Sequence, residues 1–311
     1  MRVGIHPPGK YNSSVTLPNF LIIGAGRAGT TSLHHYLRQH PEVFMPERKE
    51  PSYFAWADGA LPSGVPGTDW LRETVVTSRT AYEAMFADAR GARAIGEASP
   101  AYLASSDAPA RIQATIPDAR LVAILRDPVE RAHAQWLGLR RDGVDPAPTF
   151  EEALRQEDRR ISAGWPYAGL TLNSFYHRLL SRYYERFPPE QIRVCLFDEL
   201  AADPLALMRD LFTFLGVDPG FVPDVSRRYG GTGTVRNPML RALWTGTASA
   251  RHLVRPLLPL QWRNAVFAWI TRDGMKEPLA PATRAQLVER FRDDVMALQG
   301  LIGRDLSAWL R

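Results

Sequence analysis

The pattern with the clearest chemical meaning is a glycine-rich turn at residues 24–31, which reads GAGRAGTT. It fits the dinucleotide fingerprint G-x-G-x-x-G, and it also fits a Walker A loop in which Thr30 replaces the lysine. In either motif glycines let backbone amides converge on phosphate oxygens, and the following helix adds its positive end. The turn therefore predicts a ligand that carries phosphate. Because the Walker lysine is missing, ATP or GTP hydrolysis is disfavoured.

Two ligand classes fit this turn. A dinucleotide also needs an acidic residue at the end of the second strand, and Glu42 or Glu47 can supply it. The three successive hydroxyls of residues 30–32, together with Arg27, suit a phosphate–sulfate group better. A structural turn that binds nothing is disfavoured for so glycine-rich a segment.

The elements that position this turn are predicted from apolar runs and capping residues. Apolar runs predict strands, and helical spacing behind Asp-Pro or Thr-x-x-Glu caps predicts helices. Residues 55–80 are predicted as a loop, and residues 218–280 only as loops and helices packed over the sheet. We expect strands at residues 20–23, 43–45, 94–97, 121–125 and 192–197, and helices at 30–39, 107–116, from 128, from 150, and at 173–187, 204–216 and 281–301.

This alternation of strands and helices predicts an α/β fold. We expect a mainly parallel sheet flanked by helices, with a P-loop-like loop after the first strand. Ligands of such folds bind at the carboxyl ends of the strands. The glycine-rich turn and Arg126, which follows the strand at 121–125, should both lie there.

Composition narrows the choice of partners. The net charge of +5 comes from 38 basic and 33 acidic residues without a Lys/Arg run, which disfavours nucleic acid and suits an anionic small ligand. Only three basic residues are lysines, so a cation that takes part in chemistry is expected to be an arginine. Cys195 is the single cysteine, so we expect neither an intrachain disulfide nor a thiolate metal cluster.

The apolar segments predict no membrane insertion. The first residues lack the apolar core of a signal peptide. Prolines and charged residues interrupt the apolar stretch at residues 253–270, so we expect no transmembrane segment there. A cytoplasmic location is the expectation that follows.

Short motifs continue along the chain after the glycine-rich turn. They are FLIIGAGRAGTTSL at 20–33, His-Pro at 40–41, KEPSYF at 49–54, GEASPAYL at 96–103, LRDPVER at 125–131, and later landmarks at 187–188, 198–200, 203–204, 214–217 and 303–309. This ordered series resembles the sulfotransferases that use 3′-phosphoadenosine 5′-phosphosulfate (PAPS), especially the branch with heparan sulfate sulfotransferases and many bacterial relatives. The resemblance covers most of residues 18–311.

The resemblance implies an organisation and an activity. It implies an N-terminal arm at residues 1–17 and a single sulfotransferase domain at 18–311, in which 55–92 and 218–280 are acceptor-side or lid insertions. The expected activity moves a sulfuryl group from PAPS to a hydroxyl or amine of a small-molecule, lipid or carbohydrate acceptor. Such a displacement requires a base for the acceptor proton and a cation for the leaving oxygen, and it requires no metal.

The resemblance also implies roles for residues. Glu50, in a turn between Pro46 and Pro51, matches the catalytic carboxylate, and Glu97 is the second candidate for the base. Arg27 should hold the phosphosulfate and offset charge on the leaving oxygen. The expected nucleotide-binding residues are Gly26, Arg27, Ala28, Gly29, Thr30, Thr31 and Ser32 for the phosphosulfate, Arg126 for the 3′-phosphate, and Arg236 in a later loop.

Three positions depart from the family pattern. Arg27 stands where a lysine is usual, Ala98 where a lysine is often found, and Ala134 where a serine helps to bind the 3′-phosphate. His133 or Gln135 can supply the donor that Ala134 lacks. Two other functions stay open, namely a nicotinamide- or flavin-dependent oxidoreductase built on the same turn, and a catalytically inactive nucleotide-binding relative.

Overall fold

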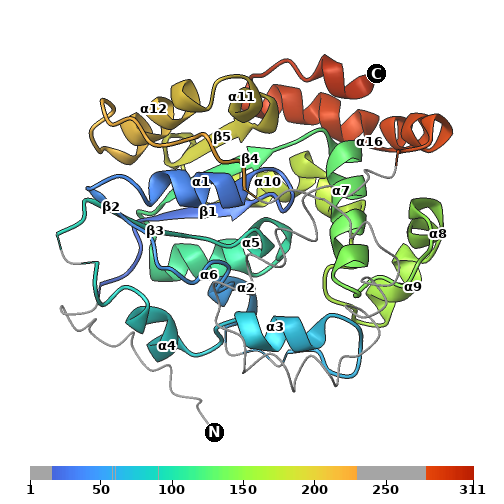
Figure 1. Ribbon diagram of the computed structural model, residues 1–311, viewed down its shortest axis with the longest axis horizontal. Helices are drawn as coiled ribbons and strands as arrows, with labels where there is room; N and C mark the ends of the chain where they lie inside the picture. The colour runs from blue at the N-terminus through green and yellow to red at the C-terminus, as the bar shows by residue number, and fades with distance from the viewer. Residues whose placement is uncertain (1–15, 58, 60, 90, 230–277) are drawn as a thin grey trace, which may run out of the picture.

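A five-stranded parallel sheet forms the centre of the protein (Figure 1). The computed structural model describes residues 16–57, 59, 61–89, 91–229 and 278–311. The strands are β1 (Phe20–Gly24), β2 (Val43–Phe44), β3 (Ala94–Ala98), β4 (Arg120–Leu125) and β5 (Ile192–Leu196), in the spatial order β2-β3-β1-β4-β5. Each pairing among these strands is parallel, so their carboxyl ends share one edge. The predicted fold class is confirmed.

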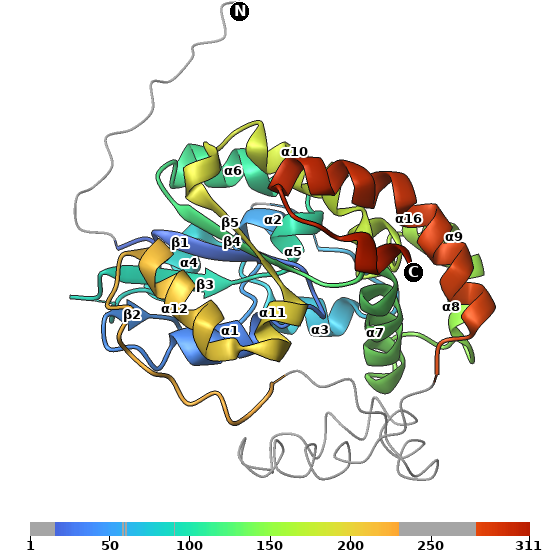
Figure 2. The same cartoon turned by 90° about the horizontal axis from the view of Figure 1, so that it is seen from above.

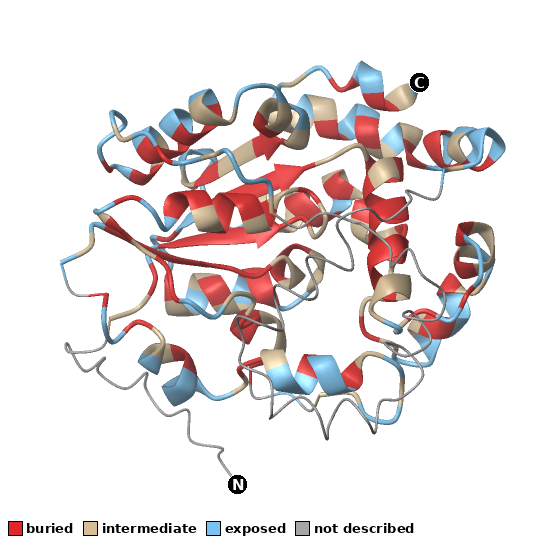
Figure 3. Ribbon diagram, in the orientation of Figure 1, coloured by how far each residue is buried: buried red, intermediate tan, exposed pale blue. Residues whose placement is uncertain are grey.

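Helices cover both faces of the sheet, as Figure 2 shows. One face carries α1 (Thr30–Leu37), α11 (Phe197–Ala202) and α12 (Pro204–Leu215), and the other carries α5 (Ala101–Ala104), α6 (Ala108–Thr115) and α10 (Tyr176–Tyr184). β1 and β3 are buried at every position, and the sheet forms the buried interior in Figure 3. Continuous apolar runs are typical of strands covered on both faces, and this explains why they were recognisable in the sequence.

The capping residues predicted from the sequence begin the expected helices. Asp127 accepts hydrogen bonds from the amides of Val129 (2.8 Å) and Glu130 (3.0 Å) at the start of α7 (Pro128–Arg141). Thr149 caps α8 (Phe150–Arg155), and Asp203 caps α12 in the same way. Each cap satisfies amide groups that have no partner within the helix.

The prediction of a loop at residues 55–80 was wrong. The structure has α2 (Tyr53–Trp56), α3 (Thr68–Thr74) and α4 (Arg79–Ala84) in and around this segment. These helices are too short to show a helical period, and the N-cap of α3 is Gly67, which offers no capping side chain. The helix predicted at 173–187 is divided into the 3₁₀ turn η1 (Leu172–Ser174) and α10.

The C-terminal segment returns to the body of the fold. α16 (Pro281–Ile302) packs on α10 and α7, and the final turn η4 (Ser307–Leu310) packs on α16. In the chain, α9 (Glu157–Ser162) follows α8, and the 3₁₀ turn η2 (Pro189–Gln191) lies between α10 and β5. Most of the predicted insertion at 218–280, with Arg236, lies outside the described residues. Within the described part of the chain, no helix is both long and apolar enough to cross a membrane.

We predict that a methyl group added to Gly96 destabilises the sheet. A Cβ atom there would lie 2.3–2.5 Å from three atoms of the buried Phe20 ring on the neighbouring strand β1. Gly96→Ala should lower the free energy of unfolding in urea by about 2 kcal/mol or more, as overpacked cores do. Gly300→Ala is the control, because its Cβ would meet no atom within 4 Å. The control should be neutral or stabilising by about 0.5 kcal/mol or more. Equal unfolding midpoints for Gly96→Ala and the unmodified protein would contradict this account.

Candidate functional site

The glycine-rich turn and Arg126 meet at the carboxyl edge of the sheet, because β1 and β4 are neighbours. The amide of Ala25 donates to the carbonyl of Ile124 (2.7 Å), and Nη1 of Arg126 donates to the carbonyl of Arg27 (3.4 Å). These bonds hold the two predicted nucleotide-binding segments side by side. The parallel topology therefore brings together residues 99 positions apart in the chain.

The start of α1 has no capping side chain. Its N-cap, Gly29, has φ 105° and gives no side-chain capping bond. A Cβ atom on Gly29 would lie 2.7 Å from Cδ2 of Leu200, so this position has no room for a side chain. The first-turn amides, the hydroxyls of Thr30 and Thr31, and the positive end of the helix form a cradle of the kind that binds phosphate or sulfate.

Ser32 takes part in a contact that the sequence did not predict. Its hydroxyl accepts a hydrogen bond from the amide of Tyr229 (3.1 Å) and donates to the carbonyl of the same residue (3.4 Å). The ring of Tyr229 stacks on His35, with ring centroids 4.0 Å apart. Ser32 therefore anchors the segment that ends at residue 229 on α1.

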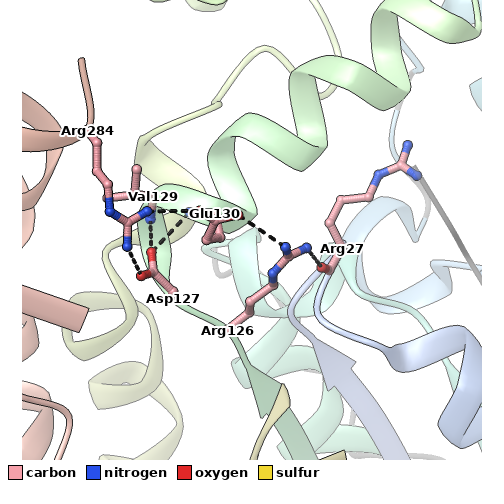
Figure 4. A network of polar contacts seen from close by, with 6 residues as sticks. All are labelled: Arg27, Arg126, Asp127, Val129, Glu130 and Arg284. Carbon is pink, nitrogen blue, oxygen red and sulfur yellow. Dashed lines mark hydrogen bonds and ion pairs between the residues drawn. The ribbon is translucent and has the colours of Figure 1, made fainter. Parts of the chain in front are cut away.

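Arg27 leaves the turn toward α7, as Figure 4 shows. Its guanidinium lies against Gly138, where an added Cβ atom would be 2.1 Å from Nη2. Burial and the nearby Arg141 lower the pKa of Arg27, while Asp142 and Glu50 oppose that change. The guanidinium is thus placed among charged groups from α7 and from the turn that carries Glu50.

Glu50 lies at the carboxyl end of β3, where its amide donates to the carbonyl of Ala98 (3.0 Å). Its carboxylate forms an ion pair with Lys49 and acts electrostatically on Arg27. The Glu50 side chain keeps 32% of its surface exposed, so a ligand can reach it. The Glu50 carboxylate is therefore accessible and lies within electrostatic range of Arg27.

Glu97, the second candidate base, is fully buried. Its carboxylate accepts hydrogen bonds from Ser99 (2.8 Å), Tyr102 (2.5 Å) and Tyr82 (3.3 Å). Burial raises the pKa of Glu97 to about 7, and the three hydrogen bonds oppose that rise. A carboxylate closed off in this way has no room for an acceptor, which argues against a role as the base.

Glu97 instead supports the turn that carries Glu50. The hydroxyl of Ser99 donates to Glu97 and accepts from the amide of Ser52 (2.9 Å). The hydroxyl of Ser52 in turn donates to the carbonyl of Glu50 (3.3 Å). Three hydrogen bonds thus connect the buried carboxylate of Glu97, through Ser99 and Ser52, with the backbone of Glu50.

Arg126 belongs to a charged network in which its pairing with Glu130 is an interpretation open to the sequence and the part played by Arg284 is not (Figure 4). Its Nη2 lies 3.4 Å from Glu130, and its guanidinium covers the ring of Phe197 at 4.9 Å. Arg284, from α16, contacts both Glu130 (2.8 Å) and Asp127 (2.9 Å). Glu130 therefore lies between two guanidinium groups. No local pattern could reveal Arg284, because it lies 154 positions away from Glu130.

The structure also shows where the residues that depart from the family pattern lie. Ala134 is buried on α7 and Ala98 is buried at the end of β3. His133 packs between Trp136 (5.7 Å) and Phe150 (5.1 Å), measured between ring centroids. Gln135 faces the glycine-rich turn, with Oε1 4.0 Å from the position of a Cβ atom on Gly26. Of the two substitute donors, Gln135 is the one beside the turn.

Among the residues that the structure describes, no group of three or more His, Cys, Asp or Glu side chains is arranged to hold a metal ion.

Comparisons with known proteins agree with this geometry. The structure aligns with a sulfotransferase from Alicyclobacillus acidocaldarius at a TM-score of 0.76 and 32% identity, over 96% of this chain and 100% of the other. Among curated proteins, the chain is similar to human bifunctional heparan sulfate N-deacetylase/N-sulfotransferase 3 (29% identity, 66% of this chain and 23% of the relative). It is also similar to human heparan sulfate glucosamine 3-O-sulfotransferase 3A1 (29% identity, 68% and 48%).

The chain thus spans less than half the length of these curated relatives. Residues 18–221 match the family described as the sulfotransferase family, and this range holds the glycine-rich turn, Glu50 and Arg126. As the motif series predicted, the chain belongs to the sulfotransferase family.

Proposed function

We propose that the protein transfers a sulfuryl group from PAPS to a hydroxyl or amine of a small-molecule, lipid or carbohydrate acceptor. The observation that carries this proposal is the accessible carboxylate of Glu50, which is held at the carboxyl edge of the sheet where Arg27 and the uncapped start of α1 also lie. A base, a cation and an anion cradle are the groups that the displacement requires.

Each group has a defined task in the proposed reaction. The amides at the start of α1 and the Arg27 guanidinium bind the phosphosulfate. Glu50 takes the proton from the acceptor as the new bond from acceptor to sulfur forms. The bond from sulfur to the bridging oxygen breaks, and Arg27 stabilises the charge that builds on that oxygen. Adenosine 3′,5′-bisphosphate leaves, with its 3′-phosphate held by Arg126.

The dinucleotide alternative loses its acidic residue. Glu42 precedes β2, at the amino end of the strand, and its carboxylate accepts the amide of Asp218 (2.8 Å) and pairs with Arg93 (3.3 Å). A ribose-binding carboxylate must lie at the carboxyl end. Glu47 follows β2, but β3 lies between β2 and β1, so Glu47 does not follow the strand next to the one that carries the glycine-rich turn. The geometry therefore favours sulfuryl transfer over hydride transfer.

Binding of adenosine 3′,5′-bisphosphate tests the nucleotide part of the proposal. Titration calorimetry should show binding of the bisphosphate and much weaker binding of NAD or ATP. Arg126→Ala should weaken it by roughly tenfold or more, because a bond to a charged group contributes about 1.5–3 kcal/mol. Arg193→Ala is the control, since Arg193 lies on β5 and pairs with Asp210 outside the site. Unchanged affinity in Arg126→Ala would refute the assignment of the 3′-phosphate site.

The second prediction concerns the base. Glu50→Gln keeps the shape of the side chain and removes its basicity, so release of bisphosphate from PAPS should slow by about 100-fold or more. Affinity for the bisphosphate should change little. Glu47→Gln, an exposed neighbour in the same segment, serves as the control and should keep normal turnover. Normal turnover in Glu50→Gln would assign the proton transfer to another group.

The third prediction concerns the position of Arg27. Gly138→Ala places a methyl group where the guanidinium lies, and the flexible Arg27 side chain can move away without disturbing the helix. Turnover should fall by about tenfold or more, because a misplaced group of this kind stabilises the transition state less. The unfolding midpoint should stay nearly constant. In an Arg27→Ala background the same substitution should have no further effect. Additive losses of turnover in the double variant would disprove that Gly138→Ala acts through Arg27.

A further inference from the structure

Backbone strain concentrates around the proposed catalytic residues. Among the described residues other than glycine, φ is positive at Arg27 (68°), Glu50 (61°), Ser52 (52°) and Tyr167 (65°). This conformation is unfavourable for residues with a side chain and is found most often at functional sites. Arg27 and Glu50 form the site, and Ser52 belongs to the turn beside it. Tyr167 is the one member of this group to which no role has been assigned.

Tyr167 lies within electrostatic reach of Glu50. Burial raises the pKa of Tyr167, and the Glu50 carboxylate raises it further. Tyr167 follows Pro166, in the segment between α9 and η1, and so approaches Glu50 from a part of the chain far away in sequence. Hydrogen bonds hold the end of α3 at the turn that carries Glu50, because Arg48 donates to the carbonyl of Thr74 (2.7 Å) and the amide of Val76 donates to the carbonyl of Pro51 (2.8 Å). Tyr167 and the end of α3 therefore both lie near this turn.

A second aromatic ring, that of Trp70, contacts Tyr167. The rings of Trp70 and Tyr167 meet edge to face, with centroids 5.4 Å apart and planes at 73°. Gly67, at the start of α3, allows close packing, because a Cβ atom there would lie 3.1 Å from Val144 and 3.4 Å from Pro166. α3 is thus held against the segment that carries Tyr167, and this contact fixes Trp70.

Trp70 is unusual in its exposure. Its exposed fraction is 44%, and the other large apolar side chains exposed among the described residues, Val222 and Met296, are not aromatic. Exposed aromatic rings that are held rigidly are typical of binding sites, because they offer a flat apolar face at little cost in conformational entropy. A core role would have buried this ring instead.

We propose that Trp70 and Tyr167 form an acceptor-binding wall, which receives an acceptor whose reacting hydroxyl or amine is carried on a ring. This inference rests on the function proposed above. A sugar ring or an aryl ring has the required flat apolar face, and stacking it on the wall directs its hydroxyl or amine toward Glu50. An open-chain alcohol offers no such face.

Binding to the protein saturated with adenosine 3′,5′-bisphosphate tests this wall. The probes are 2-naphthol, cellobiose and 1-hexanol. Their binding is measured by saturation-transfer NMR and by titration. At least one ring probe should bind, and 1-hexanol should bind at least tenfold more weakly. The ring probe that binds identifies an aryl or a sugar acceptor. The absence of binding by both ring probes, or equal binding of 1-hexanol, would overturn the proposal.

Variants separate acceptor binding from a structural role. Trp70→Ala and Tyr167→Leu should each weaken binding of the ring probe by about tenfold. Tyr167→Phe keeps the ring and should stay within about twofold. Met296→Ala, which removes an exposed apolar side chain on α16, is the control. Affinity for the bisphosphate should be constant in all four. Unchanged affinity for the ring probe in Trp70→Ala would refute the wall.

Failure of this inference is distinguishable from failure of the proposed function. If the unmodified protein does not bind the bisphosphate, the proposed sulfotransferase activity is contradicted. The ring probes can then be titrated into the protein without the bisphosphate. If a ring probe binds to the unmodified protein in the absence of the bisphosphate and does not bind to Trp70→Ala, the acceptor-binding wall is still supported. Bisphosphate binding without ring binding would overturn the wall and leave the proposed activity intact.

Discussion

The catalytic side of the molecule depends on one buried carboxylate. Glu97 cannot be hydrated, so its oxygens must receive hydrogen bonds from the protein, and Tyr82, Tyr102 and Ser99 supply them. Tyr82 belongs to α4 and Tyr102 to α5, while Ser99 also receives the amide of Ser52. Satisfying one carboxylate therefore fixes two helices and a turn. The accessible Glu50 is positioned because an inaccessible glutamate lies behind it.

The parallel sheet adds the second constraint. Since β3, β1 and β4 are neighbours with one direction, the segments that follow them emerge at the same edge. These segments carry Ser99, which binds the turn that follows β2, together with the glycine-rich turn and Arg126. The topology therefore brings the residues proposed as the base, the anion cradle and the 3′-phosphate ligand to one edge, although they are far apart in the sequence. α7, which begins directly after Arg126, then returns Gly138 to the guanidinium of Arg27.

The sequence predicted those features that depend on interactions between residues close together in the chain. Asp127, Thr149 and Asp203 cap helices because their side chains reach amides two or three residues away, and buried strands appear as apolar runs. It did not predict that Ser32 holds Tyr229, that Glu97 is enclosed, or that Arg284 reaches Glu130. Each of these depends on which distant element covers a side chain, and no spacing within a motif contains that information. The helices at residues 53–84 were missed because they are stabilised by packing, as Gly67 shows.

The network around Arg126 connects the C-terminal helix with the segment for which we propose binding of the 3′-phosphate. Two guanidinium groups close to each other repel, and Glu130 lies between those of Arg126 and Arg284 with contacts of 3.4 and 2.8 Å. Arg284 also reaches Asp127, whose other oxygen caps α7. Glu130 is therefore held mainly from the α16 side, by the shorter contact. Arg126 keeps the weaker contact and stays available for a more highly charged partner, which a 3′-phosphate would be. On this argument α16 contributes to the site without contacting the nucleotide, because it sets the charge that Arg126 meets before the ligand arrives.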